Sequence, residues 1–227
     1  MYNITFFSTR HGDAGRCNYL ELYNIIMQLK PEVIFDEIPP SLFNEQYTNM
    51  RNDKLETNAI KLYLLKYNIK HIPVDLDIIM PQSFWDKNKY LFEQIEKNNF
   101  EFCRLCDYDS QYARQYGFNY LNSKYNININ KDKDNEMEKT LKILDKKELF
   151  ETYESWIEIN EKRENEWILN IYKYCKENIF EKGMFFAGGA HRESIINKIK
   201  KYNETEDLNI KWNYLDYDNN EVKLIEI

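Results

Sequence analysis

The chain has few cysteines, which form disulfides, and few prolines and glycines, which interrupt helices and strands. It has four cysteines, five prolines and six glycines among 227 residues. So few cysteines exclude a dense disulfide framework, and no apolar run approaches the length of a membrane-spanning helix. The length is sufficient for a substantial core without disulfides or structural metals. With 43% hydrophobic and 30% charged residues, the composition predicts an ordinary globular protein.

Basic residues are also in deficit, since 31 Lys and Arg face 38 Asp and Glu, a net charge of −7. That balance argues against a broad basic face for nucleic acid. The first residues lack a basic segment followed by a long apolar run, so we expect no signal peptide and a cytoplasmic protein with reduced thiols. Cys103 and Cys106 have CxxC spacing, but no second ligand pair accompanies them, which favours a plain helical position.

The pattern of apolar residues predicts an α/β fold. In the first third, strands at 3–9, 32–38 and 69–77 alternate with helices at 17–30 and 53–68, the second helix with Asp53 as its N-cap. Residues 81–180 have helical periodicity, interrupted by a polar loop at 126–135. Strands follow at 182–189, 208–217 and 222–227, with a helix at 190–203. We therefore predict one domain over 1–227, with a central parallel or mixed sheet flanked by helices and a large helical insertion between strands three and four.

Polar residues gather where these strands end. In open α/β sheets, ligands bind beyond the carboxyl ends of the strands. Neighbouring parallel strands bring such residues to one edge of the sheet. The candidates are Ser8, Thr9, Arg10, His11, Gly12 and Asp13 after the first strand, Asp36 and Glu37 after the second, Asp75 and Asp77 after the third, and Gly188, Gly189, Ala190 and His191 after the fourth.

Imidazoles and carboxylates together perform two kinds of chemistry. They ligate a divalent metal with one position open for water, or they activate water directly, with histidine as the base and a carboxylate orienting it. Gly188 and Gly189 suit a sharp turn with positive φ and a backbone close to a ligand, where helix N–H groups hold an oxyanion. A histidine at a strand end is more commonly a turn or capping residue, and His71, within a strand, is expected to be packed or exposed. The matching contexts of His11 and His191 favour function.

An ordered set of motifs resembles the TraB/TIKI superfamily, which includes erythromycin-esterase-like and ChaN-like proteins. The motifs are STRHGD at 8–13, PEVIFDEIPP at 31–40, IPVDLD at 72–77, EKRENEWILNIY at 161–172 and FFAGGAHRESI at 185–195. The resemblance covers most of the chain, although the middle helices match only in general character.

The hallmarks of this superfamily are two GxxH motifs, a glutamate that closes the second strand, and an arginine on the helix before the second GxxH. The second motif, which ends at His191, fits fully, whereas Ser8 replaces the glycine of the first, which ends at His11. Glu37 and Arg163 stand at the other two positions. The serine predicts a narrower site or a different ligand.

The resemblance implies a hydrolase-like centre. Some members are similar to metal-dependent proteases, esterase-like members use histidine and glutamate to activate water without metal, and ChaN-like members bind haem iron. For this chain the resemblance implies His11, Glu37, Arg163 and His191 as catalytic residues. His11, Glu37 and His191 would also be the metal ligands, a mixed nitrogen and oxygen set that suits Mn²⁺, Co²⁺ or Zn²⁺.

We therefore expect a hydrolase of a peptide or ester bond in which Arg163 holds a substrate carboxylate or the charge on the attacked carbonyl. Asp36 and Asp75 are expected to fix an imidazole tautomer. The alternative is a non-catalytic protein that sequesters a peptide, macrocycle or haem in the same cleft, and a third is an interaction protein whose middle helices bind a partner. The sequence leaves the substrate and the oligomeric state open. The residues expected to bind substrate are Arg10, Asp75, Gly188 and Gly189.

Overall fold

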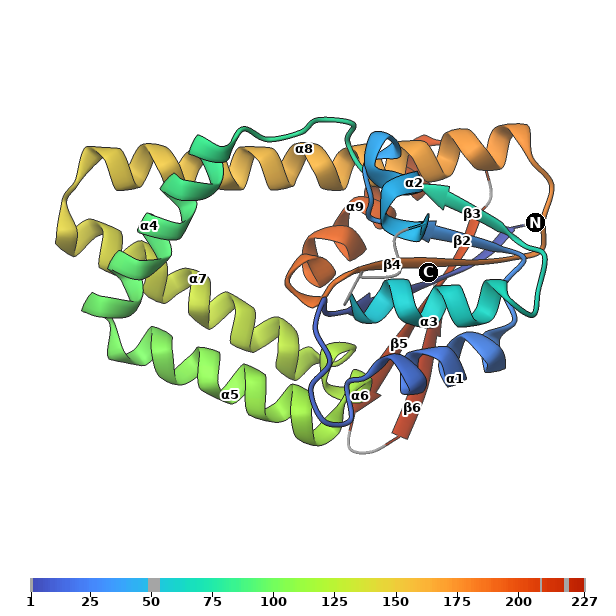
Figure 1. The fold of residues 1–227 in the computed structure, drawn as a ribbon, viewed down its shortest axis with the longest axis horizontal. Coiled ribbons are helices and arrows are strands. Elements are labelled where there is room, and N and C mark those ends of the chain that lie inside the picture. The colour runs from blue at the N-terminus through green and yellow to red at the C-terminus, as the bar shows by residue number, and fades with distance from the viewer. Residues whose placement is uncertain (1, 49–53, 209, 219–220, 227) are drawn as a thin grey trace.

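The computed structural model describes residues 2–48, 54–208, 210–218 and 221–226. Its strands form one sheet in the order β3-β2-β4-β1-β5-β6 (Figure 1). Strands β1 to β5 run parallel, and β6 pairs with β5 in the antiparallel sense. The predicted α/β class is confirmed, and the sheet is mixed because of its last strand. The strands are β1 (Tyr2–Thr9), β2 (Val33–Asp36), β3 (Lys70–Pro73), β4 (Lys182–Gly188), β5 (Ile210–Asp218) and β6 (Glu221–Glu226).

The central strands are apolar on both faces. β1 is buried from Ile4 to Thr9, and β4 is buried from Gly183 to Ala187. Phe6 and Phe185 are partners in the parallel register, and their stacked rings have centroids 5.4 Å apart. Strands of a parallel sheet are covered on both faces, so their sequences are continuous apolar runs rather than alternating ones. Such runs therefore located both strands in the sequence.

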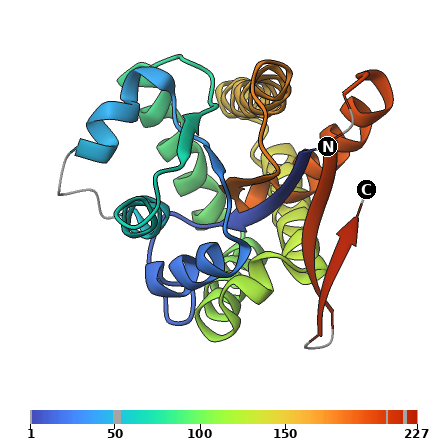
Figure 2. The same ribbon diagram turned by 90° about the vertical axis from the view of Figure 1, so that its right-hand side faces the viewer.

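Helices cover the two faces of the sheet (Figure 2). The second half of α8 (Lys147–Glu177) and α9 (Arg192–Thr205) pack on one face, where Trp167 and Ile199 belong to a large apolar core. α1 (Tyr19–Leu29), α3 (Leu55–Leu64) and the short α6 (Phe118–Leu121) pack on the other. This two-sided cover leaves the carboxyl ends of the strands as the edge available for a ligand.

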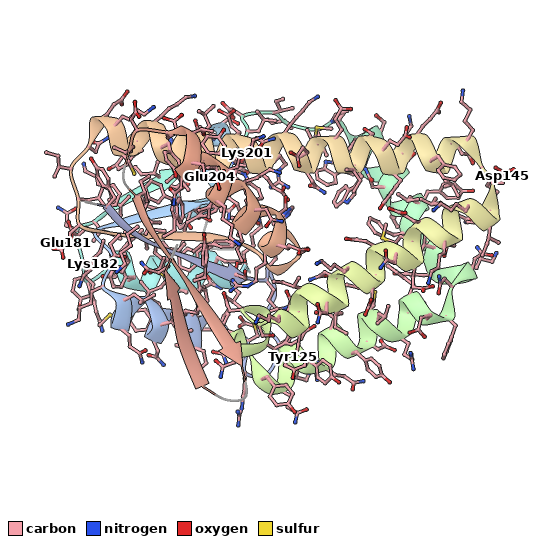
Figure 3. The ribbon with its side chains drawn as sticks, turned by 180° about the vertical axis from the view of Figure 1, so that it is seen from behind. Tyr125, Asp145, Glu181, Lys182, Lys201 and Glu204 are labelled. Carbon is pink, nitrogen blue, oxygen red and sulfur yellow. The ribbon has the colours of Figure 1, made fainter. Side chains whose placement is uncertain are left out.

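A large helical segment lies between β3 and β4, as predicted. It comprises α4 (Gln82–Asn98), α5 (Phe100–Tyr116), α6, α7 (Lys124–Leu144) and α8. α4, α5, α7 and the first half of α8 extend away from the sheet, and we call these four elements the helical arm (Figure 1). Figure 3 shows Asp145 at the far end of the arm, where α7 is followed by α8. The arm has its own small core, formed by Leu91, Ile95, Phe102, Met137, Leu141 and Leu149.

Helix α8 connects the arm to the sheet. Its 31 residues make a helix about 46 Å long, since each residue rises about 1.5 Å. Leu149 near its start belongs to the core of the arm, while Trp167 and Ile171 belong to the core beneath the sheet. One continuous helix therefore carries side chains from the arm to the edge where the strands end.

The polar loop predicted at 126–135 is wrong, because this stretch lies inside α7. Its polar side chains bond within the arm: Asn126 Nδ2 donates to Asp109 Oδ1 over 3.2 Å, and Lys133 Nζ donates to Asp109 Oδ2 over 3.0 Å. Ser123 caps the helix by accepting from the N–H of Asn126. Asp109 stands on α5, so the tertiary partner that stabilises this polar helix is not visible in the local sequence.

The structure of the first third of the chain differs from the prediction in two details. α2 (Pro40–Thr48) follows β2 directly, and Pro40 occupies its first position, where a missing N–H has no cost. α3 begins at Leu55, with Lys54 as an N-cap whose side chain makes no capping bond. The predicted cap, Asp53, lies outside the described residues.

Candidate functional site

The predicted residues meet at one edge of the sheet. β1, β4 and β2 are parallel neighbours, and the register pairs Thr9 with Gly188 and Asp36 with Phe186, so the segments after these strands lie together. They surround a cavity of about 660 Å³, a size usual for a small-molecule site. Every residue predicted to be catalytic or substrate-binding lines it, namely Arg10, His11, Glu37, Asp75, Arg163, Gly188, Gly189 and His191.

The imidazole of His191 is held by a carboxylate that the sequence did not indicate. Its Nδ1 lies 2.6 Å from Oε1 of Glu164, a buried residue of α8. Burial works to raise the pKa of Glu164, but the hydrogen bonds from His191 and Ser194 and the charge of Lys198 outweigh it and lower that pKa. An ionised Glu164 accepts a hydrogen bond from Nδ1–H, and in the neutral form of such a ring Nε2 is the acceptor nitrogen. The ring also packs edge-on against Trp167, with centroids 5.0 Å apart.

Glu37 follows β2, and its side chain is held by β4, the strand beside β2 in the sheet. Its Oε2 accepts a hydrogen bond from the backbone N–H of Gly188 over 3.1 Å, and its side chain is 11% exposed. Burial raises the pKa of Glu37, and the nearby charges of His191, His11 and Arg163 partly offset that rise. A carboxyl group that retains its proton to higher pH beside an imidazole is a common arrangement in sites that transfer protons.

The two glycines serve a different purpose from the one predicted. Gly188 has φ of −56°, and neither it nor Gly189 is among the positive-φ residues, so the expected left-handed turn is wrong. A Cβ on Gly189 would lie 3.1 Å from Oδ1 of Asn126, a tight contact with the arm. A Cβ on Gly188 would lie 3.7 Å from the ring of His191 and 4.0 Å from Glu37. Their small size therefore permits neighbouring side chains to approach closely. Their backbone conformations are ones that other residues can also adopt.

His11 is open to solvent, with a side chain that is 63% exposed. Its Nε2 lies 3.7 Å from Oε1 of Glu37, and its Nδ1 lies 3.5 Å from Oε1 of Glu56. The interaction with Glu56 is the largest cause of a raised pKa for His11, and Glu37 adds to it. Glu56, in the first turn of α3, is buried and was not among the residues predicted for the site.

Asp75 holds Arg163 rather than an imidazole. The guanidinium donates from Nε to both carboxylate oxygens over 3.1 Å and from Nη2 to Oδ2 over 2.8 Å. Trp167 Nε1 donates to Oδ1 of Asp75 over 2.6 Å, and Arg163 lies over the Trp167 ring at 5.1 Å. Burial lowers the pKa of Arg163, but Asp75 and nearby carboxylates raise it overall, so the guanidinium keeps its positive charge. The planar head of Arg163 is therefore fixed at the cavity.

Asp36 also differs from its predicted role. It accepts hydrogen bonds from the hydroxyl of Tyr47 over 2.6 Å and pairs with Nε2 of His71 over 3.2 Å. His71 is thus a packed residue beside β2, which is one of the two alternatives expected for it. The carboxylate that fixes an imidazole of the site is Glu164, whereas Asp36 fixes one outside it.

Ser8, the departure from the first GxxH pattern, lies away from the cavity. Its N–H donates to Asn122 Oδ1 over 2.8 Å, its carbonyl accepts from Asn122 Nδ2, and its hydroxyl accepts from Arg192 over 3.2 Å. The residues of β1 that line the cavity begin at Thr9. The expectation that serine narrows the site is therefore wrong, because its hydroxyl is directed into a buried polar network.

The donor atoms were tested against the predicted metal centre. Within the described residues, no group of three or more His, Cys, Asp or Glu side chains is arranged to hold a metal ion. His191 has one ring nitrogen engaged by Glu164, and Nε2 of His11 lies 3.7 Å from Oε1 of Glu37. As they stand, these side chains do not form a ligand set, and the assignment of Mn²⁺, Co²⁺ or Zn²⁺ stays a prediction.

Comparison of the chain with family models, with curated protein sequences and with solved structures finds no match. The resemblance to the TraB/TIKI superfamily therefore rests on the motifs and their order. No helix in the described ranges has the length and apolar character needed to cross a membrane.

Proposed function

We propose that this chain is a hydrolase that cleaves an ester or peptide bond by water activation at His191, in the manner that its resemblance to esterase-like TraB/TIKI members implies. The observation that supports this best is the Glu164–His191 pair, 2.6 Å apart, at a cavity that Glu37 and Arg163 also line. A histidine with one nitrogen bonded to a carboxylate and the other directed to substrate is the usual form of a general base.

In the proposed reaction, Nε2 of His191 takes a proton from water as the water oxygen bonds to the carbonyl carbon. Glu164 stabilises the imidazolium that results, because its negative charge lies 2.6 Å from Nδ1. Collapse of the tetrahedral intermediate breaks the bond to the leaving oxygen or nitrogen. His191 then returns its proton to the leaving group, which gives an acid and an alcohol or amine.

Arg163 and Glu37 complete the proposed centre. The guanidinium, fixed by Asp75, stabilises the negative charge that develops on the carbonyl oxygen. Glu37 shares the cavity and is held by Gly188, which suits its carboxyl group to orient the attacking water. No step in this scheme passes through a metal.

The proposal is tested by assaying the purified chain on 4-nitrophenyl acetate and on a mixed peptide library. We expect His191→Ala to lose about 10²–10⁴-fold in rate while it keeps the circular dichroism spectrum of the wild type. Ser110→Ala, which changes another residue of the same cavity, is the matched control and is expected to retain activity. Activity that His191→Ala leaves intact would contradict the proposal, and absence of any cleavage would favour the binding alternative.

A further inference from the structure

Part of the cavity wall is apolar and is contributed by the segment after β3 and by the helical arm. Its residues come from the segment after β3, from the first turn of α4 and from the first half of α8. We call it the apolar wall, and it consists of Ile78, Ile79, Met80, Phe84, Trp85 and Trp156.

The aromatic part of the apolar wall is ordered by its own contacts. Phe84 and Trp156 are stacked with ring centroids 6.3 Å apart, and Phe84 meets Trp85 edge-on at 5.3 Å. Part of the wall is nevertheless left open, since Trp85 is 49% exposed and Ile79 is 69% exposed. Large apolar side chains that gather at a cavity and remain open to it are typical of a ligand site.

Helix α8 sets the distance between the apolar wall and the proposed centre. Trp156 and Arg163 are seven residues apart, which places them on the same side of the helix about 10 Å from each other along its axis. Glu164, which holds His191, is the next residue. A ligand that contacts both Arg163 and Trp156 must therefore extend for about 10 Å along the helix.

We propose that the apolar wall is an acyl subsite, so that the preferred substrates are esters of medium-length aliphatic or aromatic acids. The inference rests on the proposed function, because it names the substrate class of the same centre. An acyl chain suits this wall because it has no polar groups to satisfy over the required length. A peptide of that length would present backbone N–H and C=O groups to apolar side chains, which is costly without hydrogen-bond partners.

The test compares 4-nitrophenyl octanoate with 4-nitrophenyl acetate, below the concentration at which the octanoate aggregates. Each buried methylene contributes about fourfold, so we expect kcat/KM to be at least about tenfold higher for the octanoate. Trp85→Ala and Ile79→Ala change exposed side chains and are expected to fold normally. Each should lose most of the preference for octanoate while its activity on acetate stays within about twofold of the wild type. Phe100→Ala, which removes an exposed aromatic ring of the arm that does not line the cavity, should change neither rate.

Equal kcat/KM for the two esters, or an octanoate preference that survives both substitutions, would overturn the acyl subsite. If neither the esters nor the peptide library is cleaved, the proposed function fails, and the subsite is tested separately by calorimetric titration with octanamide and acetamide; cleavage of peptides alone would overturn the acyl subsite. Tighter binding of octanamide that Trp85→Ala weakens would then support the subsite in a binding protein. Equal or absent binding of the two amides would overturn it.

Discussion

Glu164 and His191 stand 27 residues apart in the chain, and Oε1 of the glutamate lies 2.6 Å from Nδ1 of the imidazole. The pair joins the long helix of the arm to the turn after β4. Burial works to raise the pKa of Glu164, but the interactions with His191 and Ser194, and with Lys198 Nζ 3.2 Å from Oε2, lower it overall. This relationship gives the ring of His191 a fixed orientation before any substrate arrives.

Glu164→Gln is therefore expected to reduce kcat by about 10²-fold or more with little change in KM. The amide keeps the shape of the side chain but carries no charge to stabilise the imidazolium, and it offers either an N–H or a carbonyl to Nδ1. Steady-state kinetics on the best ester measure the effect. Glu154→Gln, an exposed position of the same helix, is the matched control. Unchanged kcat in Glu164→Gln would show that His191 acts without this partner.

Glu37→Gln is expected to lower activity and to raise stability. The pKa of Glu37 is higher in the folded protein than in the unfolded chain. Protonated Glu37 therefore adds fully to the free energy of unfolding below the unfolded pKa, near 4.5. That contribution is lost as the pH rises through the folded pKa. At pH 7–8 the variant should melt about 2–4 °C above the wild type, and the difference should shrink as the pH approaches 4. Thermal melts across that pH range measure it, with Glu154→Gln as the exposed control. A lower melting temperature for Glu37→Gln than for the wild type at pH 8 would show that the buried carboxylate of Glu37 does not destabilise the fold.

Histidine titration tests the contact between His11 and Glu56. The raised pKa of His11, caused chiefly by Glu56, means that protonated His11 stabilises the fold fully below pH 6.5. That contribution is lost as pH rises through the folded pKa, and exposure to solvent makes it small. In Glu56→Gln the pKa of His11 should fall toward 6.5, which NMR can follow because the chain has only three histidines. An unchanged titration of His11 would show that Glu56 does not pair with it in solution.

Local sequence patterns located the sheet and the edge where the site lies. The apolar runs that became β1 and β4 are covered on both faces, and the polar residues that follow them mark where that cover ends. His11 and His191 could be placed together because parallel neighbouring strands end at the same edge. The edge at which such residues lie follows from strand direction, whereas the adjacency of β1 and β4 is given by the order of the strands in the sheet.

Partners on other elements were beyond the reach of local patterns. Glu164 carried one signal, since it shares a helix face with Trp167, Ile168 and Ile171 and a carboxylate on an apolar face requires a partner. The pattern does not say that the partner is His191. The polar stretch at 126–135 was predicted as a loop for the same reason, because Asp109, which satisfies it, stands on another helix.

Metal content separates the two forms of the proposed chemistry. In the arrangement described, His191 Nδ1 is bonded to Glu164 and the side chains of His11 and Glu37 do not converge with it as a ligand set. We therefore expect ester cleavage to survive dialysis against a chelator, with less than one equivalent of Mn, Co or Zn in protein purified without chelator. Elemental analysis of the wild type, His11→Ala and His191→Ala measures this directly, and Ser110→Ala serves as the control for handling. One equivalent of metal in the wild type that is lost from both histidine variants would instead establish the predicted metal centre. In that case these side chains must rearrange on binding, because as described they are not grouped as a ligand set.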